Sequence, residues 1–310
     1  MMAIGRTVAP EAQSWSQVAR RRGPRETWGQ KGPPPTPRQT RTPAEIDTQV
    51  PHASRIYDYL LGGTTNFGVD REMADRVFNA VYAGGIDAAR SDVRENRAFL
   101  GRTVRYLAGD VGIRQFLDIG TGIPTEDNVH QVAQRVAPES RIVYVDYDLI
   151  VRAHATRLLE STPEGATDYV TADLREPEKI LEEAKATLDF RRPLALMLVA
   201  ILHVVPDQDD AYGIVARLLK AMPSGSYLVL SHLASDINAD ETDEAVKLLN
   251  ARARETFFLR DRTEVARFFD GLELLDPGVV TVDRWRPTEA HRRRPGHRTT
   301  PIYGAVARKP

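Results

Sequence analysis

The stretch QFLDIGTGIPT at residues 115–125 decides the predicted fold. Its apolar first half is typical of a buried strand, and Gly120 and Gly122 allow the backbone to turn sharply and approach a ligand closely. Pro124 suits the first position of a helix, where its missing N–H costs nothing. Apolar residues then recur at positions 129, 132, 133 and 136, which is the spacing of one helical stripe. A strand, a G-x-G turn and a helix form the first half of a nucleotide-binding βαβ unit.

The residues around this turn indicate the kind of ligand. A dinucleotide fingerprint requires a third glycine, and Thr125 stands at that position. Glu126 and Asp127 are expected in the first helical turn, where they would repel a pyrophosphate, and Asp118 adds a third negative charge. The pattern therefore favours a positively charged ligand without phosphate, such as S-adenosylmethionine. The alternative is an ordinary glycine-rich turn that binds no ligand.

The composition excludes several classes of protein. The formal net charge of −1 over 310 residues gives no global reason to expect nucleic acid as a partner. The absence of cysteine excludes disulfides, thiolate metal sites and cysteine nucleophiles, and the histidines lack metal-ligand spacing, so no metal is expected. The longest apolar run, 194–202, is about half of the roughly 20 residues that a membrane helix needs. With no apolar signal core near residue 1, we expect a cytoplasmic protein without a membrane partner.

The chain divides into three predicted segments. Residues 1–43 are expected to form a disordered, basic, proline-rich tail, and contact with nucleic acid or acidic lipid is the alternative to simple solvation. Residues 44–110 are expected to form an N-terminal helical cap, with helices near 54–61, 73–81 and 87–107. From 111 to 310, strands and helices alternate, which predicts a parallel sheet covered on both faces. The cap would cover the ligand-binding end of this sheet or only pack on one edge.

Acidic residues follow the second and third predicted strands. Asp146 ends the strand at 141–146, where an acid accepts hydrogen bonds from ribose hydroxyls in nucleotide-binding folds. A role as a helix N-cap is the alternative, and Asp148 would fill that role equally well. Asp173 and Leu174 follow the strand at 169–172 and would meet the amino group and the ring of an adenine. A cap or turn role is again the alternative.

Two histidines and one tyrosine are candidates for chemistry or for shaping the pocket. His203 follows the predicted fourth strand and His232 ends the fifth, on the rim where open α/β sheets bind ligands. Satisfied core histidines are the alternative. Tyr57 belongs to the first predicted helix and is a core aromatic by default. The loop at 286–300 contains Arg292, Arg293, Arg294 and Arg298. We expect this loop to be solvated, and contact with an acidic substrate is the alternative.

Short motifs between residues 45 and 310 match those of a known family. They are PHASRIYDYLLGG at 51–63, NF at 66–67, DRE at 70–72, FLDIGTG at 116–122, VYVD at 143–146, ADL at 172–174, LH at 202–203 and YGAVARKP at 303–310. On these motifs the chain resembles class I S-adenosylmethionine-dependent methyltransferases, and more narrowly a largely uncharacterised bacterial methyltransferase family. The motif at 51–63 is the most specific. Thr64 and Thr65 depart from the charged residues expected before Asn66.

The resemblance implies a fold and a set of site residues. The fold would be α/β: a Rossmann-like, seven-stranded, mostly parallel sheet with its last strand antiparallel, helices on both faces, and the N-terminal helical cap. Residues 111–310 would be the S-adenosylmethionine-binding methyltransferase domain. The cofactor would be S-adenosyl-L-methionine. Its binding residues would be Asp118, Gly120, Thr121 and Gly122 at the methionine end, Asp146 at the ribose, and Asp173 with Leu174 at the adenine.

Methyl transfer from a sulfonium is an in-line displacement that needs alignment and exclusion of water rather than a dedicated catalytic residue. If the acceptor must lose a proton, His203 and His232 are the predicted bases, and Tyr57 would shape the pocket. A small-molecule acceptor is expected because the cap would form a closed lid, with a protein or nucleic acid as the alternative. The rival functions are an NAD-dependent oxidoreductase on a similar fold and a non-catalytic cofactor-binding protein. The sequence does not indicate an oligomeric state.

Overall fold

The computed structural model describes residues 46–155, 159–289 and 298–310. The predicted tail at 1–43 and the arginines at 292–294 lie outside these ranges. The described residues belong to one compact unit that spans Pro43–Pro310. Within them, no helix is both long enough and apolar enough to cross a membrane.

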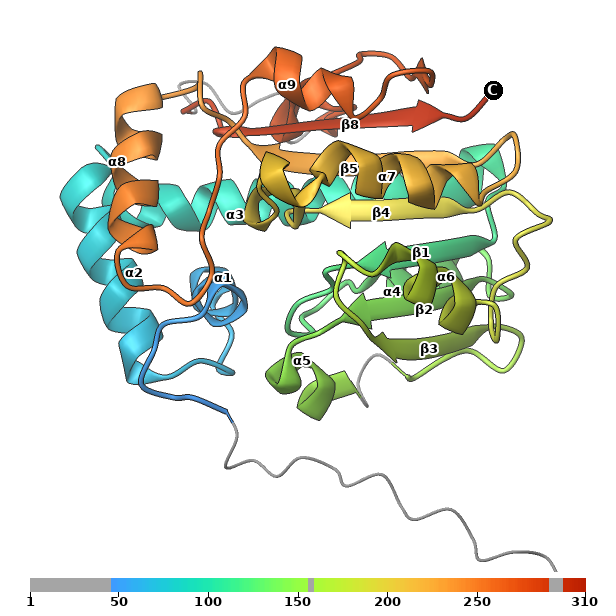
Figure 1. The fold of residues 1–310 in the computed structure, drawn as a ribbon, viewed down its shortest axis with the longest axis horizontal. Helices are drawn as coiled ribbons and strands as arrows, with labels where there is room; N and C mark the ends of the chain where they lie inside the picture. Colours follow the sequence, from blue (N-terminus) through green and yellow to red (C-terminus); the bar gives the residue numbers. More distant parts are fainter. Residues whose placement is uncertain (1–45, 156–158, 290–297) are drawn as a thin grey trace, which may run out of the picture. The chain divides into compact units, whose positions relative to one another are not determined.

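A single mostly parallel sheet organises the fold (Figure 1). In spatial order its strands are β3 (Ala166–Thr171), β2 (Arg141–Asp146), β1 (Gln115–Ile119), β4 (Ala195–Val199), β5 (Tyr227–Leu233), β8 (Ile302–Arg308) and β6 (Glu273–Leu274), and β7 (Val280–Thr281) also pairs with β8. Strands β1 to β5 are parallel, and β8 runs antiparallel to β5. Strands β6 and β7 pair with opposite ends of β8 and share the seventh position. The predicted sheet is confirmed.

Helices cover both faces of the sheet, as predicted. The side chains of each strand point alternately to one face and to the other, so each strand contributes to the core on both sides. Leu117 and Ile119 of β1 pack in one cluster with α6 (Pro177–Ala184), α7 (Ala211–Lys220) and α9 (Arg262–Arg267). Phe116 points to the opposite face and packs in a second cluster with α3 (Gly85–Tyr106) and α4 (Val129–Val136). The helix α5 (Leu149–His154) follows β2. Single-turn elements lie at 107–111, 202–204, 207–209 and 282–284.

The helical cap has its own apolar core. It contains α1 (Ala53–Leu61), α2 (Gly68–Val81), the start of α3, and α8 (Ala239–Asn250), which is inserted after β5. The core consists mainly of Ile56, Leu60, Met73, Val77, Ala245 and Leu249. Figure 1 shows α1, α2 and α8 grouped beside one end of α3. The cap therefore joins two segments that are far apart in the sequence.

The helix after the glycine turn begins later than the sequence predicts. Asn128 is the N-cap of α4 and forms a capping box with Gln131. Glu126 and Asp127 therefore lie in a loop before the helix, and Asp127 has a positive φ of 56° and pairs with Arg135. The expectation that these two carboxylates would occupy the first helical turn is wrong. A capping box satisfies two free N–H groups at once, which outweighs the preference of proline for a helix start.

Two other local contacts involve charged side chains. Asp210 is the N-cap of α7, whereas Asp207 pairs with a buried arginine at 260. Arg298 is not a solvated loop residue. It contacts Asp92 at 2.5 Å and Glu241 at 3.0 Å between side-chain nitrogen and oxygen atoms, and only 23% of its side chain is exposed.

Candidate active site

A cavity of about 150 Å³ lies at the carboxyl ends of β1, β2 and β4. The glycine turn lines one side, and residues that follow β2 and β4 line the next. The other walls come from the start of α1, from α3, and from the segment around residues 255–257. The cap therefore covers this end of the sheet instead of only packing on one edge.

The glycine turn has a backbone that other residues would disturb. Gly120 and Gly122 have φ values of 76° and 66°, in the left-handed region that favours glycine. A Cβ atom at Gly120 would overlap the side chain of Ile201, whereas nothing lies within 4 Å of the Cβ position at Gly122. Thr121 donates its hydroxyl to the backbone oxygen of Asp118 at 3.1 Å. The turn is thus held tightly at its start and leaves open space in front of its second glycine.

Two buried carboxyl groups meet at this turn. Burial raises the pKa of Asp118 to about 7, with Arg97 opposing the shift and Asp146 adding to it. Burial also raises the pKa of Asp146 to about 6, although backbone N–H groups of Asp148 and Gly122 donate to its oxygens at 2.9 Å. A cation or a set of hydroxyl donors in this cavity would stabilise both carboxylates.

Arg97 of α3 lines the same cavity and was not predicted as a site residue. One terminal nitrogen of its guanidinium donates to the backbone oxygens of Glu126 and Asp127 and to the side chain of Asn128 at 3.0–3.3 Å. Its Nε is buried and has no hydrogen-bond partner among the described residues. The sequence predicts the helix but gives no signal that selects this arginine from the others on it.

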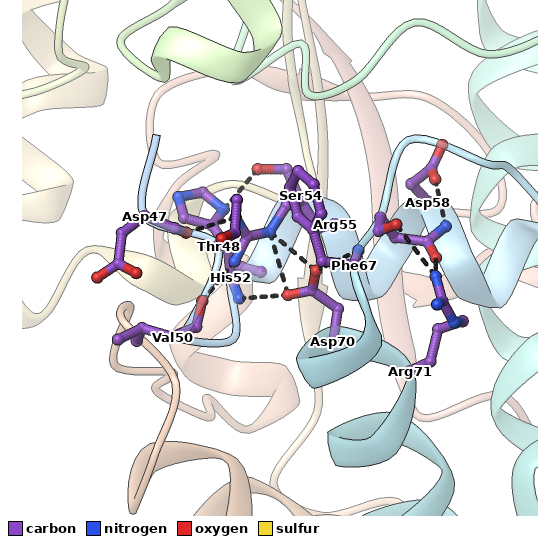
Figure 2. A network of polar contacts seen from close by, with 12 residues as sticks. Asp47, Thr48, Val50, His52, Ser54, Arg55, Asp58, Phe67, Asp70 and Arg71 are labelled. Carbon is purple, nitrogen blue, oxygen red and sulfur yellow. Dashed lines mark hydrogen bonds and ion pairs between the residues drawn. The ribbon is translucent and has the colours of Figure 1, made fainter. Parts of the chain in front are cut away.

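The motif at 51–63 serves mainly to hold α1 in place (Figure 2). Arg55 pairs with Asp70, its Nε lying 3.0 Å from the Oδ2 atom, and the two side chains are 2% and 0% exposed. Arg55 also donates to the backbone oxygen of Asp47 at 2.8 Å. The Asp70 carboxylate in turn accepts from the backbone N–H groups of His52 at 3.0 Å and Phe67 at 2.8 Å. One buried ion pair thereby fixes the starts of both α1 and α2.

The second half of the same network fixes the end of α1 (Figure 2). Asn66 donates to the carboxylate of Asp58 at 2.8 Å, and Arg71 donates to the side-chain oxygen of Asn66 at 2.9 Å. A Cβ atom at Gly63 would overlap the Asp58 carboxylate, which explains why glycine stands there. The network therefore presents the start of α1 to the cavity.

A second polar cluster lines the cavity and was also not predicted. The Nε2 atom of His52 lies 2.7 Å from Glu255 and 3.3 Å from Asp148. Ser54 donates to the same Asp148 oxygen at 3.0 Å. Burial raises the pKa of Glu255, but contact with His52 outweighs burial, and the net shift is downward. Because these residues come from three distant segments, no local pattern indicates the cluster.

The two residues that the sequence predicts at the adenine line a smaller adjoining cavity. It shares Gly120 and Asp146 with the first cavity and is also lined by Asp173 and Leu174. Leu174 is buried. Both oxygens of Asp173 contact the Arg175 side chain at 3.2–3.3 Å, so this carboxylate already has a charged partner.

His203 and Tyr57 lie on the cavity wall, as the sequence predicts. The His203 ring stacks on Phe257 with centroids 5.6 Å apart, and its Nδ1 is buried without a hydrogen-bond partner among the described residues. Burial lowers the pKa of His203 to about 4, and Arg260 contributes to this shift. The Tyr57 hydroxyl accepts from the Asn96 amide at 3.0 Å, and burial raises its pKa.

His232 does not line this cavity. It is fully buried, with Nδ1 lying 2.8 Å from the backbone oxygen of Leu233 and Nε2 lying 2.6 Å from the guanidinium of Arg260. Burial first, and then His203 and Arg260, hold its pKa well below the usual value. Both ring nitrogens are engaged inside the protein, so the expectation that His232 offers a free base is corrected.

Comparison with known proteins identifies the family of the site. A family model described as S-adenosyl methyltransferase matches residues 39–310. The chain belongs to this family of S-adenosylmethionine-dependent methyltransferases. The methyltransferase is 46% identical to a DUF574 family protein of known structure from Streptomyces avermitilis, over 85% of this chain and 99% of that one, with a TM-score of 0.81.

A second solved structure, a proposed methyltransferase from Thermobifida fusca, is 37% identical over 85% of this methyltransferase and 96% of that chain, with a TM-score of 0.75. No match was found among curated proteins. The cofactor of the methyltransferase is S-adenosylmethionine, as the glycine turn and the motifs predict.

Proposed function

We propose that this methyltransferase transfers the methyl group of S-adenosylmethionine to a small-molecule acceptor held beneath its helical cap. The observation that carries the proposal is the covered cavity, in which α1 and the segment at 255–257 face the glycine turn. A site enclosed in this way suits a ligand that the protein surrounds, whereas a folded protein or a duplex would need an open surface. When bound, the cofactor supplies an activated methyl group on a sulfonium.

The residues around the glycine turn suit the methionine end of the cofactor. Asp118 offers a buried carboxylate to the ammonium group of the cofactor. The open space in front of Gly122 leaves room for the methionine part of the cofactor. The unpartnered Nε of Arg97 supplies a donor and a positive charge for the cofactor carboxylate. Thr121 holds the turn through its hydrogen bond to the backbone. The site therefore offers a negative charge to the ammonium group of the cofactor and a positive charge to its carboxylate.

The remaining cofactor contacts follow the strand ends. Asp146 accepts from ribose hydroxyls with lone pairs that its two backbone donors leave free. Leu174 supplies an apolar surface to the adenine ring. Tyr147, which directly follows Asp146 in the chain, lines both cavities. Asp173 would accept from the adenine amino group while it keeps its contact with Arg175.

The protein aligns the acceptor and excludes water, and a base is needed only where the acceptor must lose a proton. His203 is our candidate for that base, because it is neutral near pH 7 and keeps an unpartnered Nδ1 on the cavity wall. A positioned base contributes about 10²–10⁴-fold to the rate. Tyr57 shapes the pocket beside it. Once an acceptor is identified, full turnover by a His203→Ala variant would remove the base from this proposal.

Calorimetric titration with S-adenosylmethionine and with NAD tests the proposal. Wild-type protein should bind S-adenosylmethionine and not NAD, and Asp146→Ala should bind the cofactor at least about tenfold more weakly, since it loses charge-assisted hydrogen bonds. Asp110→Ala, at an exposed position, is the matched control. Absence of cofactor binding, or equal affinity for NAD, would overturn the proposed function. Unchanged affinity in Asp146→Ala would remove only the ribose contact.

A further inference from the structure

A second cavity of about 110 Å³ adjoins the cofactor cavity beneath the cap. We propose that it is the acceptor chamber and that it selects a neutral, single-ring aromatic molecule carrying a hydroxyl or N–H group. This inference rests on the proposed function and adds the chemical class of the acceptor. An engineered cavity of about 150 Å³ accepts benzene, so this chamber and the adjoining space of the cofactor cavity suit one ring with few substituents.

The two cavities adjoin each other. Both are lined by Ala53, Tyr57, Ala200, His203 and Phe257, so these residues form the boundary between the chamber and the cofactor cavity. Ala200, directly after β4, has a φ of 58°, a left-handed conformation that residues other than glycine rarely adopt. Such strained residues concentrate at functional sites, and this one stands at the junction of the cavities.

The chamber walls are apolar and come largely from the cap. They include Ile56, Leu60, Phe78, Val246, Leu249 and Ile302, contributed by α1, α2, α8 and β8. Aromatic rings of Tyr57 and Phe257 lie at the boundary with the cofactor cavity, where they would pack against a flat ligand. The helices of the cap therefore form most of the chamber wall.

Among the described residues, Asp92 is the charged side chain that lines the chamber, and it pairs with Arg298, which also contacts Glu241. Burial raises the pKa of Tyr82 to about 12, which keeps its hydroxyl neutral. His203 and His232 are neutral near pH 7 because burial lowers the pKa of each ring. A charged acceptor would lose its hydration here without gaining a counter-charge from the described residues.

A buried polar atom at the junction, without a hydrogen-bond partner among the described residues, is the reason that we expect a hydroxyl or N–H group on the acceptor. His203 Nδ1 is buried without a partner among the described residues. A hydroxyl both donates and accepts, so it satisfies this nitrogen in either tautomer. During transfer, the lone pair of the acceptor oxygen or nitrogen forms the bond to the methyl carbon. The carbon–sulfur bond breaks with its electron pair left on sulfur, and the acceptor proton passes to Nδ1 of His203, in the tautomer that carries its own proton on Nε2.

Binding of phenol to the full chain tests the chamber, with benzoate and benzylamine as charged comparators. Each is titrated with and without S-adenosylhomocysteine, so that the chamber is measured independently of the cofactor. We expect phenol to bind with a dissociation constant of about 0.1–1 mM, which is reasonable for so small a ligand. The charged comparators should bind at least about tenfold more weakly.

Two variants and a control locate the bound phenol. Val246→Phe fills the chamber and should weaken phenol at least about tenfold, while Leu248→Phe, on the same helix and 37% exposed, should leave it within about twofold. Binding of S-adenosylmethionine to each variant reports that it is folded. His203→Phe keeps a flat ring without nitrogen, and it should abolish the preference for phenol over benzene.

The outcomes separate the two proposals. Equal phenol affinity in Val246→Phe and wild type, equal affinity for charged comparators, or no phenol binding by a chain that binds S-adenosylmethionine would each overturn the chamber. Unchanged preference for phenol over benzene in His203→Phe would overturn the role given to Nδ1. A chain that binds phenol as expected but does not bind S-adenosylmethionine would instead overturn the proposed function.

Discussion

Cofactor affinity should depend on pH through Asp118. Burial raises the pKa of this carboxyl to about 7, with Arg97 opposing the shift and Asp146 adding to it. If the ionised form holds the cofactor ammonium, the free protein must release a proton before it binds below pH 7. Affinity should therefore fall as pH falls.

The size of the effect follows from the ionised fraction. With a pKa of about 7, Asp118 is about half ionised at pH 7.0 and about 3% ionised at pH 5.5, which lowers the affinity about 15-fold. The amino group of the cofactor stays protonated across this range, since α-amino groups titrate near 7.7–8.0. Asp146, with a pKa of about 6, changes in the same direction and adds at most about fourfold.

Isothermal titration calorimetry at pH 5.5, 6.0, 6.5 and 7.0 measures this dependence. The matched variant is Asp118→Asn, which keeps the shape of the side chain and removes its titration. We expect weaker binding by the variant at pH 7.0 and a pH dependence no steeper than the share of Asp146. A wild-type dissociation constant that changes less than about threefold over this range, or equal slopes in both proteins, would refute the pairing of Asp118 with the ammonium.

Three further predictions concern stability. Because burial raises the folded-state pKa of Asp118 from 3.8 to about 7, its contribution to stability is fully present below pH 3.8 and is lost as pH rises through 7; Asp118→Asn should therefore be more stable than wild type by about 4 kcal/mol at pH 8, with the difference vanishing near pH 4, as thermal melts at both pH values will show. Gly120→Ala forces a Cβ against Ile201 at a positive φ and should cost about 2–4 kcal/mol in urea denaturation, so an unchanged midpoint would contradict the geometry of the turn. Arg55→Met leaves the Asp70 carboxylate buried without its charged partner and should cost about 3–5 kcal/mol, and the same variant with Asp70→Asn added should recover part of that loss.

The sheet was predictable because its signal is local. Strands β1, β2, β4 and β5 are short apolar runs, and the central ones are buried on both faces. The segment at 278–285 has the apolar content of a strand, but only Val280 and Thr281 pair with β8 before the chain turns, and Trp285 packs into the core. Apolar residues indicate burial in the central strands and in this segment alike, but they do not distinguish a hydrogen-bonded strand from a packed turn.

The two candidate bases show the limit of position along a strand. His203 follows β4 and His232 lies near the end of β5, on the same rim, and their rings lie only 6.0 Å apart. Nevertheless, His203 lines the cofactor cavity, whereas His232 is held by Arg260 inside the core. The end of a strand determines where a residue lies along the sheet. The contacts of its side chain also depend on other segments: Arg260, which contacts His232, lies 28 residues further along the chain.

The cavity residues at the glycine turn were predictable for the same local reason, and the residues that line the opposite wall were not. Arg97 and Glu255 reach the cavity from α3 and from the loop after α8. Glu255 accepts from the backbone N–H of Ala53 across 202 positions of sequence. Such contacts arise from the packing of the cap on the sheet, which no spacing within one element encodes.

The cap also couples the two proposed binding sites through one helix. Tyr57 and Ala53 of α1 line both cavities, while Ile56 and Leu60 face only the chamber. The position of α1 is fixed at its start by the buried pair of Arg55. A small displacement of α1 must therefore alter the cofactor cavity and the chamber together, because rigidly packed helices move as units. The buried polar residues of the N-terminal motif therefore hold the wall that the two cavities share.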